Sequence, residues 1–298
     1  MKNILHRLAL SLLLILPVVA HATGSTGAIA AHPTLWTVHG KTGGTVYLFG
    51  AIHLLPLNIA WRRAEVDDAM AASGSFVFEA PTDASGAAEV KAYVAAHGML
   101  PDGVTLSSLL PPAARKEYED AVAKAQLPPA MVDREQPWLA AITLEVAMMM
   151  HQNYAPDAGV DREVAAYATA HGKPLRYLET IGQQMALMDP PDRKLAVKEF
   201  VVALKSLRDD PAEIGAMVDA WSHGDQPAID RIMNGDLARE PGAKKLMLDD
   251  RNKAWVTKIE AMLAEPQTVF ITVGAAHLAG PGGVPALLRK AGYRVDGP

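Results

Sequence analysis

Two histidines and two glutamates each come just after a short segment of apolar and β-branched residues. His53 and His277 end two copies of the pattern Gly-x-x-His, and Glu79 and Glu179 each follow a further segment of this kind. In α/β proteins, ligand sites form outside the carboxyl ends of the strands. We therefore expect these four side chains to share one site if the four segments are neighbouring strands.

The two histidines and Glu79 are residue types that hold divalent metals. Two imidazoles and one carboxylate suit manganese, cobalt, zinc or iron, and a metal with an open position could activate water. The same residue types can activate water without a metal, and a single Gly-x-x-His occurs often by chance. The residues alone therefore leave open a metal site at His53, His277 and Glu79, a metal-free site, and ordinary loop positions.

Four charged residues have two interpretations each. Glu79 could be a ligand or a cap on the next helix, and Glu179 could be a general base or a structural acceptor for backbone donors. Asp161 stands at a predicted helix start, where it could act as an N-cap without any chemistry or could belong to the site. Arg251, inside a predicted helix, could pair with a site carboxylate or stabilise a developing oxyanion, or it could lie on a solvated helix face or in a structural ion pair.

Strands that would position these residues are predicted near both ends of the chain. The pattern of residues 268–273 is a continuous apolar and β-branched run, typical of a strand buried on both faces. Further strands are expected at 35–38, 45–49, 75–79, 176–178 and 293–295.

The middle of the chain is predicted to be mostly helical, because proline and glycine separate segments with helical periodicity. Helices are expected over 60–72, 84–97, 111–125, 137–153, 161–171, 192–207, 211–223, 226–234, 242–264 and 284–291. We predict an α/β fold with one mixed β-sheet, built from strands near both ends of the mature chain, with the helical middle as a large insertion.

The first 22 residues are typical of a cleavable export signal. Lys2 and Arg7 precede an apolar run over 8–19, and Ala20-His21-Ala22 has the small-x-small pattern that precedes cleavage. The run is short for a membrane span, which needs about 20 apolar residues. We expect cleavage after Ala22, a periplasmic or secreted protein without a membrane anchor, a disordered stretch over 23–34, and one domain over 35–298.

Composition excludes several classes of function. The chain has no cysteine, so disulfides, thiolate zinc sites, iron–sulfur clusters and cysteine nucleophiles are excluded. Its formal net charge is -5 at pH 7, and it has no basic run. This charge argues against binding to nucleic acid or to an anionic membrane surface.

These features together resemble the TraB/PrgY/GumN family, and most of all its short exported GumN-like members. The matching segments follow the family's order over nearly the whole mature chain: Tyr47–His53, Phe76–Glu79, Gly159–Asp161, Leu178–Gln184, Arg251-Asn252, Val273–Gly280, Leu287-Leu288 and Gly292-Tyr293. The resemblance assigns the paired histidine motifs and the glutamate to His53, His277 and Glu79. In the distantly related Tiki metalloproteases, such residues are implicated in manganese- or cobalt-dependent peptide cleavage.

The resemblance implies a metal-dependent, peptidase-like hydrolase that acts on a peptide or other small envelope substrate. Manganese, cobalt or zinc would be held by His53, His277 and Glu79. Glu79 or Glu179 would move protons, and Arg251 would balance negative charge. Two alternatives stay open: a metal-free His/Glu hydrolase like the erythromycin esterases, and a binding protein without catalysis. The latter would take a peptide, glycan or haem-like ligand in envelope or exopolysaccharide physiology.

Overall fold

The computed structural model describes residues 27–209, 212–235 and 241–298. The expected export signal, residues 1–22, lies outside this part of the chain. Within it, no helix is both long and apolar enough to cross a membrane. Residues 29–30 form a short strand, β1, that pairs with β5, and the backbone N–H of His32 donates to Ser222. The expected disorder of residues 23–34 therefore does not extend over the described residues 27–34.

The main sheet has six strands in the order β10-β2-β3-β9-β6-β8. Strands β3, β9, β6 and β8 run parallel to one another, whereas β2 pairs antiparallel with β3 and with β10. The predicted α/β fold, with one mixed sheet made from both ends of the chain, is confirmed. The strands are β2 (Leu35–His39), β3 (Thr45–Ala51), β6 (Ser75–Phe78), β8 (Leu175–Tyr177), β9 (Thr268–Gly274) and β10 (Arg294–Asp296).

Burial along the strands explains this order. Strands β6 and β9 are buried along almost their whole length, as their unbroken apolar sequences predict for the middle of a sheet. Strand β2 lies next to the edge strand β10 and alternates between buried and half-buried residues. Apolar side chains from the two faces of the sheet belong to two separate core clusters.

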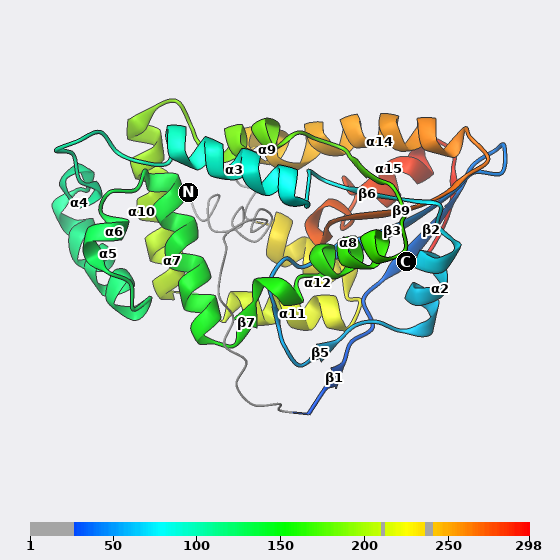
Figure 1. The fold of residues 1–298 in the computed structure, drawn as a ribbon, viewed down its shortest axis with the longest axis horizontal. Helices are drawn as coiled ribbons and strands as arrows, with labels where there is room; N and C mark the ends of the chain where they lie inside the picture. Colours follow the sequence, from blue (N-terminus) through cyan, green and yellow to red (C-terminus); the bar gives the residue numbers. More distant parts are fainter. Residues whose placement is uncertain (1–26, 210–211, 236–240) are drawn as a thin grey trace.

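Helices cover both faces of the sheet (Figure 1). On one face, α14 (Asp250–Leu263) and α15 (Val284–Lys290) pack Trp255, Ile259 and Leu288 against β-strand residues such as Val46 and Ile271. The other face carries the larger cluster, which includes three stacked or tilted aromatic rings from Phe49, Phe76 and Phe270. Helices α2 (Ala64–Ala72), α8 (Val160–Ala170), α11 (Glu213–Ser222) and α12 (Gln226–Ile229) lie on this side in Figure 1.

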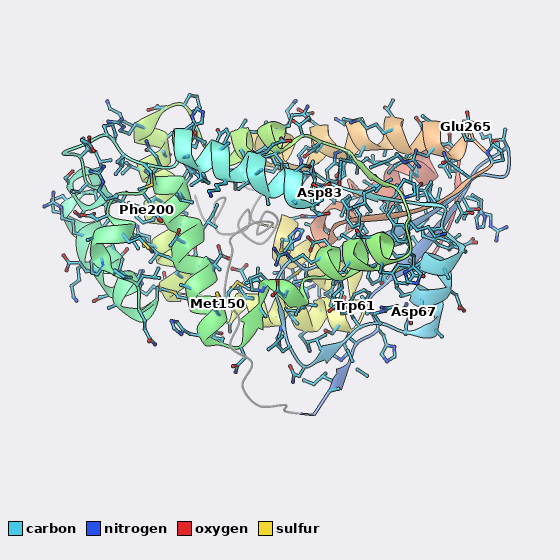
Figure 2. The ribbon with its side chains drawn as sticks, in the orientation of Figure 1. Trp61, Asp67, Asp83, Met150, Phe200 and Glu265 are labelled. Carbon is cyan, nitrogen blue, oxygen red and sulfur yellow. The ribbon has the colours of Figure 1, made fainter. Side chains whose placement is uncertain are left out.

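The helical middle of the chain forms a second lobe beside the sheet (Figure 1). Phe200 and Met150 lie in this lobe, whereas Trp61 lies on the sheet side of the molecule (Figure 2). The helices of this second lobe are α4 (Leu106–Leu109), α5 (Pro112–Lys124), α6 (Pro129–Val132), α7 (Pro137–His151) and α10 (Arg193–Asp209). Along the top of the view in Figure 1, α3 (Ala84–His97) and α9 (Ile181–Met188) connect this lobe to the sheet.

Several short elements were not expected from the sequence. Residues 59–60 form the strand β5 (Ile59–Ala60), so the helix expected from residue 60 begins at Ala64. Another short pair is β4 (Leu55–Pro56) with β7 (Tyr154–Ala155), and η1 (Pro156–Ala158) follows it. The helices expected over 226–234 and 242–264 are interrupted by π-helical segments, η2 (Asp230–Asn234) and η4 (Lys245–Asp249), the second preceded by α13 (Pro241–Lys244).

Candidate functional site

The four polar residues expected at strand ends lie along one edge of the sheet. Strands β3, β9, β6 and β8 are consecutive and parallel, so their carboxyl ends meet at the same edge. His53 follows β3, Glu79 follows β6, Glu179 follows β8, and His277 ends the short helix η5 (Ala275–His277) after β9. His53, Glu79 and His277 are each at most 5% exposed. The sheet order therefore builds a buried polar cluster.

The glycines of the two Gly-x-x-His segments are required by space. A Cβ atom at Gly50 would lie 3.1 Å from Cα of Ala275, where the ends of β3 and β9 approach each other. At Gly274, a Cβ atom would lie 3.1 Å from Oε1 of Glu79. Neither position depends on a left-handed backbone. The motif thus lets two strand ends and a carboxylate come close together.

Arg251 of α14 is the centre of this cluster. Its Nε donates to Oε1 of Glu179 at 2.7 Å, and its Nη2 donates to Oε2 of Glu179 at 2.9 Å and to Oε2 of Glu79 at 2.8 Å. Its Nη1 donates to the carbonyl of Met247 at 3.2 Å and to Nε2 of His277 at 3.0 Å. An arginine has five N–H donors, so every one is engaged and none is left for an oxyanion in this arrangement.

The charges around Arg251 keep it protonated. Burial alone would lower the pKa of the guanidinium, but the negative charges of Glu79 and Glu179, with their hydrogen bonds, outweigh burial and raise it. Because the guanidinium is 8% exposed and bridges two carboxylates, it neutralises a part of the site that would otherwise hold unbalanced negative charge.

Both glutamates are held by several donors. Oε1 of Glu79 accepts from the backbone N–H of Gly274 at 2.6 Å, and Oε2 accepts from Nε2 of Gln184 at 3.0 Å as well as from Arg251. Oε1 of Glu179 also accepts from Nε1 of Trp255 at 2.8 Å. These contacts position the two carboxylates as acceptors, and the donors to Glu179 are side chains of α14 and not the backbone donors that one of its interpretations expected.

His277 is held by two consecutive residues of α14. Arg251 can only donate, so Nε2 of His277 must be the acceptor, and Nδ1–H must then donate to Oδ1 of Asn252 at 2.6 Å. The amide of Asn252 is itself fixed, because its Nδ2 donates to the carbonyl of Gly282 at 2.9 Å. The ring of Trp255 lies against the imidazole, with centroids 4.3 Å apart. These contacts select one neutral tautomer.

The surroundings of His277 also oppose its protonation. Burial is the main cause that lowers its pKa well below the ordinary value, and the positive charge of Arg251 and the proximity of His53 lower it further. A neutral imidazole whose acceptor nitrogen receives a hydrogen bond from Arg251 is a poor proton carrier at neutral pH. In this arrangement both ring nitrogens of His277 have protein partners, Arg251 at Nε2 and Asn252 at Nδ1.

His53 is paired with Asp161, which lies in the first turn of α8. Nδ1 of His53 lies 2.8 Å from Oδ1 of Asp161, and both side chains are almost fully buried. The turn is brought close by Gly159, where a Cβ atom would lie 2.3 Å from the carbonyl oxygen of His53, and by a hydrogen bond from Val160 N–H to Ile52. Asp161 therefore contacts the site and is not the N-cap residue, which is Gly159.

Comparison with known proteins identifies the family of this chain. A model of the TraB/PrgY/gumN family matches residues 34–297. The chain belongs to this family. Two relatives, both named "Uncharacterized protein YbaP", from Escherichia coli (strain K12) and from Shigella flexneri, are 25% identical over 162 residues. That match covers 54% of this chain and 59% of the length of each relative. No solved structure matches the chain.

The arrangement of His53, His277 and Glu79 does not fit the expected metal site. Both ring nitrogens of His277 are engaged with Arg251 and Asn252, and both oxygens of Glu79 accept from protein donors. A divalent cation bound to Nε2 of His277 or to Oε2 of Glu79 would compete with the guanidinium of Arg251 for the same lone pairs. Among the described residues, no group of three or more histidine, aspartate or glutamate side chains is arranged to hold a metal.

Sequence reasoning missed the residues that fix the site. Gln184, Asn252 and Trp255 each contact a predicted site residue, at sequence separations between 25 and 105. Gln184 and Asn252 lie inside segments that carry the family resemblance, which was the only sequence signal for them. No local pattern indicates Trp255.

Proposed function

We propose that this member of the TraB/PrgY/gumN family is a hydrolase that uses His53 to activate water. The observation that carries the proposal is the buried His53–Asp161 pair at the edge of the sheet. A carboxylate that accepts from Nδ1–H of a histidine fixes the tautomer in which Nε2 can take up a proton, and it stabilises the imidazolium that results. An imidazole can exchange protons near neutral pH.

In the proposed reaction, Nε2 of His53 accepts a proton from water, and the hydroxyl group attacks a carbonyl carbon of the substrate. The bond from that carbon to the leaving nitrogen or oxygen then breaks, and the imidazolium returns its proton to the leaving group. Arg251 contributes by holding Glu79, Glu179 and His277 in place. No step passes through a metal, because both ring nitrogens of His277 and both carboxylate oxygens of Glu79 already have hydrogen-bond partners in the protein.

We also propose that the protein acts in the periplasm or outside the cell on a peptide or another small envelope molecule. The support is the sequence of residues 1–22, in which positive charges precede an apolar run and a small-x-small pattern. An exported chain that begins at Thr23 is the expected result of intact-mass measurement on cell fractions. A full-length chain that stays in the cytoplasm would contradict this.

The catalytic proposal is tested with internally quenched peptides and nitrophenyl esters as substrates. His53→Gln should abolish turnover, and Asp161→Asn should lower it about 10²- to 10⁴-fold, the usual contribution of a positioned base. His223→Gln is the matched control, because His223, the residue after α11, is exposed and contacts Asp219 on the surface. Thermal unfolding of each variant checks that the fold survives.

A chelator distinguishes this mechanism from metal-dependent hydrolysis. Turnover should persist in excess EDTA, and metal analysis of the active protein should find substoichiometric manganese, cobalt and zinc. Loss of turnover in EDTA with recovery on adding one of these metals would overturn the proposal in favour of a metal-dependent enzyme.

A further inference from the structure

A pocket of about 250 Å³ lies beside the strand-edge cluster, between η2, η4 and the loop that follows β9. Its lining includes Asn252 and Ala276, but not Arg251, Glu79, Glu179 or His277. At about 30 Å³ for each water molecule, its volume corresponds to about eight waters. The pocket is thus sized for a small molecule rather than for an extended polymer.

One buried acceptor atom in the pocket, Oδ1 of Asn234, lacks a hydrogen-bond partner among the described residues. Asn234 is 8% exposed, and its Nδ2 donates to Oδ1 of Asp230 at 2.7 Å and reaches the carbonyl of Ala276 at 3.5 Å. Both amide hydrogens therefore have acceptors, which fixes the orientation of the amide. Its Oδ1 is an acceptor without a partner among the described residues. A ligand that donates a hydrogen bond would satisfy it.

Charged groups of both signs line the same space. Asp230 lies beside Asn234, so a carboxylate and an amide oxygen are available to one donor group. The guanidinium of Arg231 makes no hydrogen bond or ion pair with another described residue, and Nζ of Lys244 donates to Asp249. The charged side chains of the lining are two cations, Arg231 and Lys244, and two anions, Asp230 and Asp249. The pocket therefore favours a ligand that also carries both charges.

The backbone around the pocket is unusual. Asp230, Arg231 and Asn234 belong to the π-helical segment η2, and Leu248 and Asp249 belong to the π-helical segment η4. Single π-helical turns inside α-helices are rare and occur frequently at functional sites. Here the two π-helical segments contribute three charged residues, Asp230, Arg231 and Asp249, and Asn234 to the lining of one pocket.

We propose that this pocket binds a small zwitterion of amino-acid size. Its ammonium group would donate to Oδ1 of Asn234 and to Asp230, and its carboxylate would accept from Arg231 and Lys244. Binding there needs none of the chemistry proposed for His53. Because Asn252 lines the pocket and also holds Nδ1 of His277, the bound molecule would lie next to the residue that fixes His277.

Isothermal titration of the purified protein tests the proposal with four probes. L-alanine and L-alanyl-L-alanine carry both charges, N-acetyl-L-alanine lacks the ammonium group, and L-alaninamide lacks the carboxylate. We expect saturable binding of at least one of the two zwitterions and at least tenfold weaker binding of both capped compounds. Comparing L-alanine with the dipeptide distinguishes a free amino acid from a short peptide as the ligand.

Two variants locate the binding site. Arg231→Gln removes a charge on an exposed side chain and should weaken zwitterion binding about 10- to 100-fold, as expected for a charge-assisted hydrogen bond. Lys253→Gln removes the same charge from an exposed position outside the pocket and should leave binding unchanged. The proposal is overturned by no binding at millimolar concentration, by equal binding of the capped probes, or by Arg231→Gln with unchanged affinity.

Discussion

Replacing Arg251 with methionine tests whether the guanidinium holds the strand-edge cluster together. Methionine has a similar length but no donor, so the substitution removes five hydrogen bonds and leaves Glu79 and Glu179 as neighbouring carboxylates without a counter-charge. Breaking a buried ion pair by removing one partner costs about 3–5 kcal/mol. Because two carboxylates lose their partner here, we expect at least that loss in the free energy of unfolding.

The assay is thermal and urea unfolding at several pH values. A loss of that size corresponds to a fall in the unfolding temperature of about 6–20 °C, at about 2–4 °C for each kcal/mol. Without Arg251, burial and mutual repulsion raise the pKa values of the two carboxyls in the folded variant. The folded variant then binds protons more readily than the unfolded chain. The deficit should therefore shrink as the pH falls from 8 to 5 and grow as the pH rises.

Two further variants make this result interpretable. Arg251→Lys keeps the charge but cannot reproduce the planar set of donors, so its unfolding temperature should lie between those of the natural chain and Arg251→Met. Arg62→Met breaks an exposed pair with Asp67 and should cost less than about 1 kcal/mol. An Arg251→Met protein that unfolds within about 1 °C of the natural chain, with no dependence on pH, would refute the central role of Arg251.

Two other predictions concern single positions. Gly159→Ala should destabilise the protein and weaken any His53-dependent activity, because the new Cβ would lie 2.3 Å from the carbonyl oxygen of His53. Gly215→Ala is the control: Gly215 lies in α11 with open space around it, so this substitution should stabilise the protein by about 0.5–1 kcal/mol. Equal effects of the two on unfolding would contradict this. Burial raises the pKa of Glu135 to about 7. Its contribution to the free energy of unfolding is therefore full below about pH 4.5, where the carboxyl is protonated, and is lost as the pH rises through 7. Glu135→Gln should therefore raise the unfolding temperature at pH 8 and leave it nearly unchanged at pH 4.5, and a gain of the same size at both pH values would rule out this explanation.

Hydrophobic periodicity was enough to predict most of the secondary structure. The helix expected over 84–97 has those bounds in α3, and the strands β3 and β9 lie within two residues of their expected bounds. The convergence of His53, His277 and Glu79 followed from one rule, since residues after parallel neighbouring strands meet at one edge. Local pattern and strand topology therefore account for the fold and for the location of the cluster.

The contacts inside the cluster could not be predicted in the same way. An aspartate at a helix start has the same local sequence whether it caps the helix or pairs with a distant histidine, so the role of Asp161 depended on the approach of Gly159 to His53. The role of Arg251 required counting its donors and their acceptors in three dimensions. The sequence predicted that His277 and Glu79 hold a metal, but it could not show which protein groups form hydrogen bonds with their lone pairs in the folded chain.

All five N–H donors of Arg251 are engaged, and this limits how the residues of the cluster can change during evolution. A substitution at Glu79, Glu179, His277 or Asn252 leaves a buried group of another member without its partner. Viable intermediates between two versions of the cluster are therefore rare, and its members should be inherited or lost together. The exposed side chains of the helical lobe have no such shared partners, so they can change one at a time.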